Sequence, residues 1–306
     1  MNSTIKPIYE FVLWENCNND CDFCFLKAMA NYKDKLYNDD EKLNSLEDTI
    51  TYIQNNTFVP QSHILIAGGE LFFKPFSTVL YDKFHELITL IIDLIKEGQF
   101  DLFYINSNLL YTDFSQVYSL IIQPFIDAGL ISHLHFTTSY DPYGRYKSED
   151  ARQLFLTNLQ NISKDFKDIP GFTIYVNCIL TQPFCEDIIN GRFNQRGFQE
   201  LCFNKIYVNY LPYIPFSKPL EPSDSLIYKT LLYLFNVDKP YFIQYINTIL
   251  LNQERIVLDY NKTTREFSNR TAEVNPKCNH LQSFTKYQPN NECLLCKFKK
   301  IKDAIL

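Results

Sequence analysis

The stretch that decides the fold is Tyr9-Glu-Phe-Val-Leu-Trp-Glu-Asn-Cys17-Asn-Asn-Asp-Cys21-Asp-Phe-Cys24. Its apolar first part predicts a β-strand over residues 10–14, and its second part is a C-x3-C-x2-C motif directly after that strand. Three thiolates on a short loop can hold three corners of an iron–sulfur cube, which usually takes four cysteines. A missing fourth ligand would leave one iron open to a substrate or cofactor. A structural zinc site is the alternative, although zinc usually takes four ligands and no fourth is close in the sequence.

Beyond this stretch, short apolar runs rich in β-branched and aromatic residues alternate with longer stretches of helical periodicity. Such alternation is typical of βα units around a parallel sheet. Six expected strands in sequence predict an α/β fold, a partial (β/α)6 TIM-like barrel. The expected strands cover residues 10–14, 63–67, 101–106, 132–138, 173–180 and 205–210, and the expected helices cover residues 39–54, 78–97, 112–128, 148–162 and 186–200.

A segment punctuated by prolines ends this alternation near residue 212. Two further helices are expected over residues 223–235 and 240–251, followed by a polar segment with a second group of cysteines. We therefore predict a core domain over residues 1–220 and a small helical, cysteine-rich extension over residues 221–306.

Composition excludes some classes of function. The chain has 306 residues and a formal net charge of −6, which argues against a nucleic-acid partner, because phosphate binding needs clustered Lys and Arg. No apolar run approaches the roughly 20 residues that span a bilayer, and no signal peptide is evident, so we expect a cytoplasmic protein without a membrane partner. In that compartment nine cysteines are better explained as metal ligands or buried thiols than as disulfides.

The second expected strand runs directly into Gly68-Gly69-Glu70. Two glycines at the end of a strand let the backbone approach a ligand closely, and a carboxylate after them can accept hydrogen bonds from an ammonium group. Alone, this motif is also typical of a surface turn.

The cysteine motif after the first strand, with Phe23 before its last cysteine, and Gly68-Gly69-Glu70 after the second strand together resemble the radical S-adenosylmethionine superfamily. The resemblance covers roughly residues 8–215. It implies that the three cysteines bind a [4Fe–4S] cluster whose open iron chelates the amino and carboxylate groups of S-adenosylmethionine. Phe23 would then lie against the adenine. The residues expected to contact the methionine ammonium are Gly68, Gly69 and Glu70.

Polar side chains follow the third and fourth expected strands, in Asn106-Ser107-Asn108 and Thr138-Ser139-Tyr140-Asp141. Ligands bind at the carboxyl ends of parallel strands, and the resemblance implies that this region holds the ribose and the methionine carboxylate. Arg145 could pair with a carboxylate of the cofactor or substrate. Loop caps and a surface salt bridge are the alternatives. The candidate residues of this group are Asn106, Ser107, Ser139 and Arg145.

The resemblance implies an enzyme that reductively cleaves S-adenosylmethionine to a 5′-deoxyadenosyl radical, which abstracts hydrogen from an unidentified substrate. It also implies a low-potential electron donor such as a flavodoxin or ferredoxin. The substrate is expected to be a peptide or protein if the C-terminal cysteines hold a further cluster, with a nucleoside or nucleotide as the rival. No catalytic residue is predicted beyond the cluster. The alternative is a non-catalytic iron–sulfur or zinc-binding protein.

The C-terminal group consists of Cys278-Asn-His280 and Cys293-Leu-Leu-Cys296. Two ligand pairs at this separation suit tetrahedral zinc. The segment also resembles, incompletely, the SPASM-like auxiliary-cluster region that a subgroup of the superfamily carries. A second iron–sulfur cluster, zinc and no metal all stay open for Cys278, Cys293 and Cys296.

Overall fold

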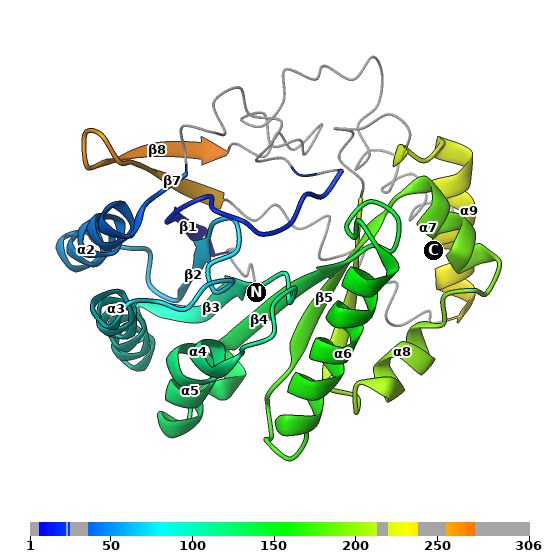
Figure 1. The fold of residues 1–306 in the computed structure, drawn as a ribbon, viewed down its shortest axis with the longest axis horizontal. Helices are drawn as coiled ribbons and strands as arrows, with labels where there is room; N and C mark the ends of the chain where they lie inside the picture. Colours follow the sequence, from blue (N-terminus) through cyan, green and yellow to red (C-terminus); the bar gives the residue numbers. More distant parts are fainter. Residues whose placement is uncertain (1–5, 23, 25–35, 213–219, 238–254, 273–306) are drawn as a thin grey trace, which may run out of the picture.

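The computed structural model describes residues 6–22, 24, 36–212, 220–237 and 255–272. These residues form an eight-stranded sheet with flanking helices (Figure 1), which confirms the predicted α/β class. The strand order is β6-β5-β4-β3-β2-β1-β7-β8, so all six expected strands are present and neighbour one another in chain order, as in a partial barrel. The strands are β1 (Ile8–Val12), β2 (Ser62–Ala67), β3 (Phe100–Asn106), β4 (Leu134–Tyr140), β5 (Ile174–Leu180), β6 (Ile206–Pro212), β7 (Arg255–Asn261) and β8 (Glu266–Ala272).

Strands β1 to β6 pair in parallel, which brings their carboxyl ends to one edge of the sheet. Val12 at the end of β1 pairs with Ala67 at the end of β2, and Tyr140 at the end of β4 pairs with Cys178 in β5. The segments that leave these strands therefore start from the same edge. Every candidate site residue on the described strands or the loops after them lies at this edge.

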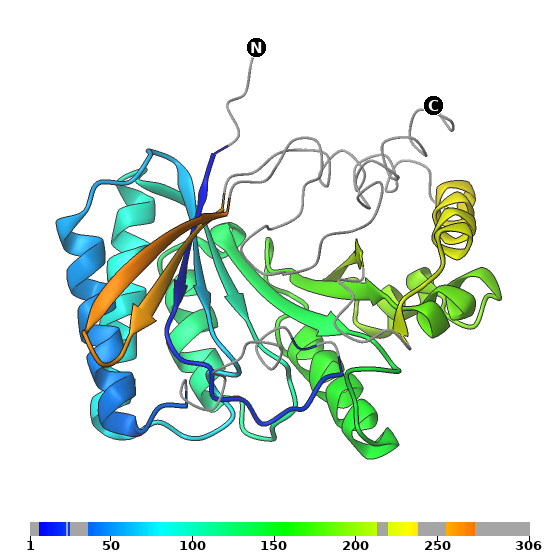
Figure 2. The same ribbon diagram turned by 90° about the horizontal axis from the view of Figure 1, so that it is seen from above.

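The helices lie along one face of the curved sheet (Figures 1 and 2). Alternate strand residues point into this helix-covered core and are fully buried, whereas Tyr104, His135, Tyr175 and Tyr207 between them are half-buried. This period of two is what a pleated strand requires. The core residues with no exposed surface include Phe11, Ile64, Phe103, Phe136, Val176 and Val208.

Three of the described helices agree closely with expectation: α2 (Asp39–Asn55), α3 (Thr78–Lys96) and α6 (Glu149–Asp165). Each begins with a side-chain cap. The side chain of Asn38 accepts from the backbone N–H of Glu41 while the Glu41 carboxylate accepts from the Asn38 N–H, and Ser77 and Ser148 accept from N–H groups in the first turns of their helices.

The expected helices over residues 112–128 and 186–200 are wrong in detail. The first is α4 (Ser115–Val117), a π-helical turn (Tyr118–Ile122) and α5 (Gln123–Asp127). In an α-helix the N–H of residue 124 would donate to the carbonyl of Leu120. Pro124 has no N–H, which accounts for the wider π-helical turn. The second divides into α7 (Gln182–Ile189) and α8 (Gln195–Leu201), because Gly191 adopts a φ of +70° between them.

The C-terminal extension contains α9 (Asp224–Val237), close to the expected helix over residues 223–235. The helix expected over residues 240–251 lies outside the described residues. The description of the extension as helical and cysteine-rich omits the hairpin β7-β8, whose first strand pairs in parallel with β1. The boundary near residue 220 stays a prediction, and chain from beyond it completes the sheet of the core. No helix in the described ranges is long and apolar enough to cross a bilayer.

Candidate metal and cofactor site

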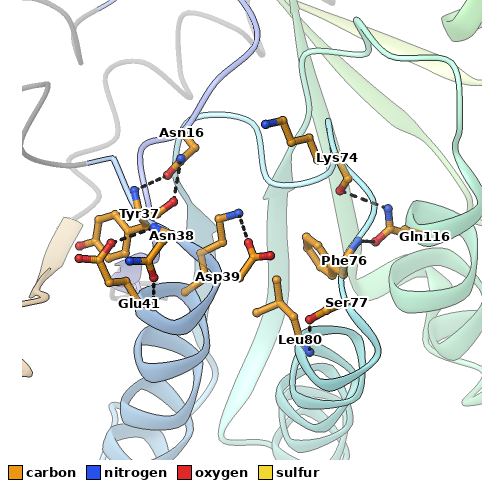
Figure 3. A network of polar contacts seen from close by, with 11 residues as sticks. Asn16, Tyr37, Asn38, Asp39, Glu41, Lys74, Phe76, Ser77, Leu80 and Gln116 are labelled. Carbon is orange, nitrogen blue, oxygen red and sulfur yellow. Dashed lines mark hydrogen bonds and ion pairs between the residues drawn. The ribbon is translucent and has the colours of Figure 1, made fainter.

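Cys17, Cys21 and Cys24 lie on the loop that follows β1, and all three are half-buried free thiols. Asn16 fixes the start of this loop, because its side chain accepts from the backbone N–H of Tyr37 at 2.9 Å and donates to the Tyr37 carbonyl at 3.1 Å (Figure 3). The chain between Asn16 and Tyr37 is thus closed at its base into a loop that holds the three cysteines.

Amide groups point at the sulfur atoms. The backbone N–H of Asn19 donates to Cys17 Sγ at 3.4 Å, and the side-chain Nδ2 of Asn19 donates to Cys21 Sγ at 3.1 Å. The side-chain Nδ2 of Asn108, from the loop after β3, lies 3.8 Å from Cys17 Sγ. Such donors stabilise negative charge on sulfur and tune iron–sulfur potentials.

Burial raises the pKa of the Cys17 and Cys21 thiols, while the Arg145 guanidinium lowers both. Cys24 also raises the pKa of each thiol through repulsion between negative charges. A bound cation would relieve this repulsion, because it favours the thiolate forms.

Gly68 and Gly69 lie directly against the cysteine loop. The Gly69 N–H donates to the Trp14 carbonyl at 3.0 Å, and the Glu70 N–H donates to the Asn16 carbonyl at 2.8 Å. A Cβ atom on Gly68 would lie 2.3 Å from the Trp14 oxygen, and one on Gly69 would lie 2.3 Å from the Asn16 oxygen. The close approach that requires glycine here is to the backbone of the cysteine loop, whereas the sequence predicted an approach to a ligand.

The carboxylate of Glu70 has no exposed surface. Its Oε1 accepts from the Phe72 N–H at 3.3 Å, and its Oε2 accepts from the Asn108 N–H and from the Ser107 hydroxyl, the latter at 3.3 Å. Burial raises the pKa of Glu70 to about 7, against the lowering effect of these bonds and of Arg145. Glu70 therefore joins the loops after β2 and β3, and its expected contact with an ammonium group stays a prediction.

The loop after β3 contributes two residues to the cluster of contacts. The Ser107 hydroxyl shares a 2.8 Å hydrogen bond with Tyr111, and Asn108 donates to Asn18 Oδ1 at 2.6 Å beside Cys17. Asn106 is exposed and its side chain instead bonds Thr137 of β4. Ser107 is thus brought to the cysteine loop, and within the described residues Asn106 makes no hydrogen bond to it.

The loop after β4 also contacts the cysteine loop. The Asp22 N–H donates to the Gly144 carbonyl at 2.7 Å, and Asn19 Nδ2 donates to the Arg145 carbonyl at 3.1 Å. The Arg145 side chain is 8% exposed, and its Nε has no hydrogen-bond partner in the part of the chain described. Ser139 is half-buried within β4 in register with Asn177 of β5, away from these contacts.

Several of these contacts involve residues that were not among the predicted site residues. Asn19 and Asn108 direct their amides at sulfur, Asn16 closes the loop, and Thr181 bonds Asp141 behind it. The available signal was the density of Asn in the motif, since Asn side chains commonly bond nearby backbone and neighbouring groups in turns. Phe23, Cys278, Cys293 and Cys296 lie outside the described residues.

A single metal ion and a cluster place different demands on the three thiols. Among the described residues, no three His, Cys, Asp or Glu side chains converge on one metal position. Zinc needs its thiolates about 2.3 Å from one centre, whereas a cube spreads them over separate irons. Three thiols beside amide donors and a buried guanidinium are a donor set that such a cube could use, with a different iron for each sulfur.

Among solved structures, the fold is similar to that of an enzyme with AdoMet bound. The anaerobic sulfatase-maturating enzyme anSMEcpe, solved with bound AdoMet and the Cp18Cys peptide, is similar to the chain with a TM-score of 0.51 at 14% identity, over 80% of this chain and 65% of that one. Structures of native and hexahistidine-tagged anSMEcpe with AdoMet give TM-scores of 0.48 and 0.49, each at 14% identity, over 80% and 81% of this chain and 65% of theirs.

The chain therefore spans 65% of the length of the enzyme it matches. At this identity the likeness establishes the fold and leaves activity, substrate and partners to be inferred from the site. The sequence matches no model of a known protein family and no curated protein.

Proposed function

We propose that this protein is a radical S-adenosylmethionine enzyme that binds a [4Fe–4S] cluster through Cys17, Cys21 and Cys24. The observation that carries the proposal is the cysteine loop itself. It lies at the carboxyl edge of a parallel sheet, hydrogen-bonded to the loops after β2, β3 and β4, within the fold of a structure solved with AdoMet. When bound, the cluster and S-adenosylmethionine together supply the electron transfer that breaks the sulfonium C–S bond and yields a 5′-deoxyadenosyl radical.

The chain's own residues prepare the site for this chemistry. The amides of Asn19 and Asn108 would hold negative charge on the sulfurs, and the Arg145 guanidinium would offset the charge of the cluster and of Glu70. Because the side chains of Asn19 and Asn108 are already held by hydrogen bonds to backbone, they need little rearrangement when the cluster binds.

Arg145 is the residue of the site that is best suited to bind a carboxylate. It is buried, its Nε is unpaired among the described residues, and it lies close enough to Glu70, Cys17 and Cys21 to act on the pKa of all three. A guanidinium binds a carboxylate through two parallel hydrogen bonds, so we assign Arg145 to the methionine carboxylate. Gly68, Gly69, Glu70 and Ser107 keep the predicted role of contacting the cofactor, with Glu70 also joining two loops.

A peptide or protein is the proposed substrate class. The solved neighbour holds the Cp18Cys peptide together with AdoMet. A flavodoxin or ferredoxin is the proposed electron donor. Incubation of the reduced enzyme with deuterated candidate peptides or nucleosides tests the class, because the hydrogen donor transfers its label to 5′-deoxyadenosine.

Metal analysis tests the proposal against a non-catalytic zinc or iron–sulfur protein. The protein purified and reconstituted without oxygen should be brown, contain iron and sulfide in equal amounts, and show a change in the electron paramagnetic resonance signal of its reduced cluster when S-adenosylmethionine is added. Stoichiometric zinc without iron would support a structural site. Iron with no response to S-adenosylmethionine would support a cluster protein without this activity.

A further inference from the structure

Asp141, the first residue after β4, has a carboxylate with no exposed surface. Its Oδ1 accepts from the backbone N–H groups of Tyr143 at 2.9 Å and Gly144 at 2.5 Å. Its Oδ2 accepts from the hydroxyl of Thr181, the residue that follows β5, at 2.6 Å. Thr181 also has no exposed surface. Asp141 thus holds a tight turn in its own loop and anchors that turn to the end of the neighbouring strand.

The turn that Asp141 holds is the part of the molecule that meets the cysteine loop. The carbonyl of Gly144 accepts from the N–H of Asp22, which lies between Cys21 and Cys24, at 2.7 Å. The next carbonyl, of Arg145, accepts from Asn19 Nδ2 at 3.1 Å, and the same Nδ2 bonds Cys21 Sγ at 3.1 Å. A continuous series of hydrogen bonds therefore runs from Thr181 through Asp141 and the turn to a cysteine sulfur.

The structure assigns to Asp141 the role of positioning residue for the cysteine loop and for Arg145, with Thr181 as its anchor. Its meaning for catalysis rests on the proposed function, but its effect on the loop belongs to the protein alone. A simple turn cap would affect only residues 141–144. These contacts predict instead that loss of Asp141 loosens the cysteines, which lie more than a hundred residues earlier in the chain.

Two substitutions separate the acceptor geometry from the negative charge. In Asp141→Asn the amide oxygen can still accept from Tyr143 and Gly144, and the NH2 group can donate to the Thr181 hydroxyl, which is able to accept. In Asp141→Ala all three donors lose their partner. If the hydrogen-bond geometry positions the cysteine loop, Asp141→Asn should keep the loop in place and Asp141→Ala should not. Thr181→Val keeps the side-chain shape and removes only the anchor.

Thiol alkylation of the full-length, metal-free protein under anaerobic conditions measures the effect. Mass spectrometry resolves the rates at the three loop cysteines from the rate at the buried Cys202, which serves as the internal control because Cys178 and Cys185 interact with Asp141. We expect the loop cysteines to react about tenfold faster in Asp141→Ala and a few-fold faster in Thr181→Val, and within about twofold of wild type in Asp141→Asn. Thr49→Val is the matched control, because Thr49 is also a buried threonine but its hydroxyl donates to the backbone carbonyl of Ser45, and it should leave the loop rates unchanged.

Unchanged loop rates in folded Asp141→Ala would overturn the inference, as would an equal rise at Cys202, which indicates global loosening. Loop rates in Asp141→Asn as high as those in Asp141→Ala would overturn the claim that hydrogen-bond geometry, rather than negative charge, positions the loop. If Asp141→Ala fails to fold, Thr181→Val decides by the same rates. Because the assay uses no cluster, failure of wild type to bind iron would contradict the proposed function while leaving this result intact.

Discussion

The side chain of Asn16 and the backbone of Tyr37 form a reciprocal pair of hydrogen bonds, at 2.9 and 3.1 Å, that closes the base of the cysteine loop (Figure 3). The Tyr37 hydroxyl in turn donates to the carbonyl of Tyr260 in β7 at 3.4 Å. The hairpin from beyond residue 220 thus contacts the base of the loop that begins the site.

Asn16→Ala should weaken both the fold and metal retention, because it leaves the Tyr37 N–H and carbonyl without these partners. We expect a loss of about 1–3 kcal/mol in the free energy of unfolding, measured by urea titration, and less iron per chain after reconstitution. Asn56→Ala, which removes an exposed bond at the end of α2, is the control and should change stability by no more than about 0.5 kcal/mol. Equal effects of the two changes would contradict the role of Asn16.

Gly69→Ala should be strongly destabilising, since its Cβ would lie 2.3 Å from the Asn16 carbonyl oxygen and 2.6 Å from that of Glu15. Backbone must move to relieve this overlap, at a cost of at least about 2 kcal/mol, and iron content should fall with it. The comparison is Gly197→Ala in α8, where the nearest side-chain atom would be 3.3 Å away. A Gly69→Ala protein as stable as Gly197→Ala would show that the two loops do not pack as described.

Arg145→Met should lower affinity for S-adenosylmethionine while the cluster still assembles. The buried guanidinium is assigned to the cofactor carboxylate, and loss of a charge-assisted pair of bonds is expected to cost about tenfold or more in the dissociation constant. Titration of the reduced, reconstituted protein with the cofactor, followed by electron paramagnetic resonance, measures this. Arg196→Met, at an exposed helix pair with Glu200, should bind normally. Undiminished affinity in Arg145→Met would remove that assignment.

The free energy of unfolding should fall as the pH is lowered from 6.5 to 4, in part because His135 becomes protonated. Burial lowers the pKa of His135 to about 4, with His63 adding to the effect. The unfolded chain therefore takes up the proton first as pH falls, and the stabilising effect of the neutral ring, at most about 3 kcal/mol, is present above pH 6.5 and lost on the way down to pH 4. We expect the free energy of unfolding, measured by urea titration from pH 4.5 to 7.5, to change less with pH in His135→Phe than in His85→Gln, which alters an exposed helix residue. An equal dependence on pH in the two variants would contradict the role of His135.

The C-terminal cysteines lie outside the described residues and allow a direct experiment. If Cys278, Cys293 and Cys296 hold a second cluster, changing all three to alanine should remove about half of the iron and leave cleavage of S-adenosylmethionine measurable. Loss of one zinc per chain with iron unchanged would identify a zinc site, and no change in either metal would exclude both.

The six parallel strands and their order could be predicted from the sequence, because buried parallel strands are continuous apolar runs. A stretch of helical periodicity also separates each of these strands from the next. Strands β7 and β8 were missed. Their sequence, which includes Asp259, Asn261, Glu266 and Arg270, is polar, and their pairing with β1 is a long-range contact that no local pattern encodes. The fold of this region follows from tertiary pairing.

The site was partly predictable. The motif spacing pointed to the cysteines, and strand ends pointed to Glu70, Ser107 and Arg145, which the structure brings to the cysteine loop. Their roles in binding a cluster and a cofactor stay predictions. The sequence did not show that Gly69 approaches the cysteine loop rather than a ligand, or that Asp141 carries the turn against that loop. Both depend on which loops meet in space, and such contacts cannot be inferred from residue type alone.

The most direct measurement of the central claim is the formation of 5′-deoxyadenosine by the reconstituted protein with S-adenosylmethionine and dithionite under anaerobic conditions. We predict product from wild type and from Cys185→Ala, which alters a buried cysteine away from the loop, and none from the triple variant Cys17→Ala, Cys21→Ala, Cys24→Ala. Product from the triple variant at the wild-type rate, or no product from an iron-loaded wild type, would contradict the assignment of these cysteines to a cofactor-cleaving cluster.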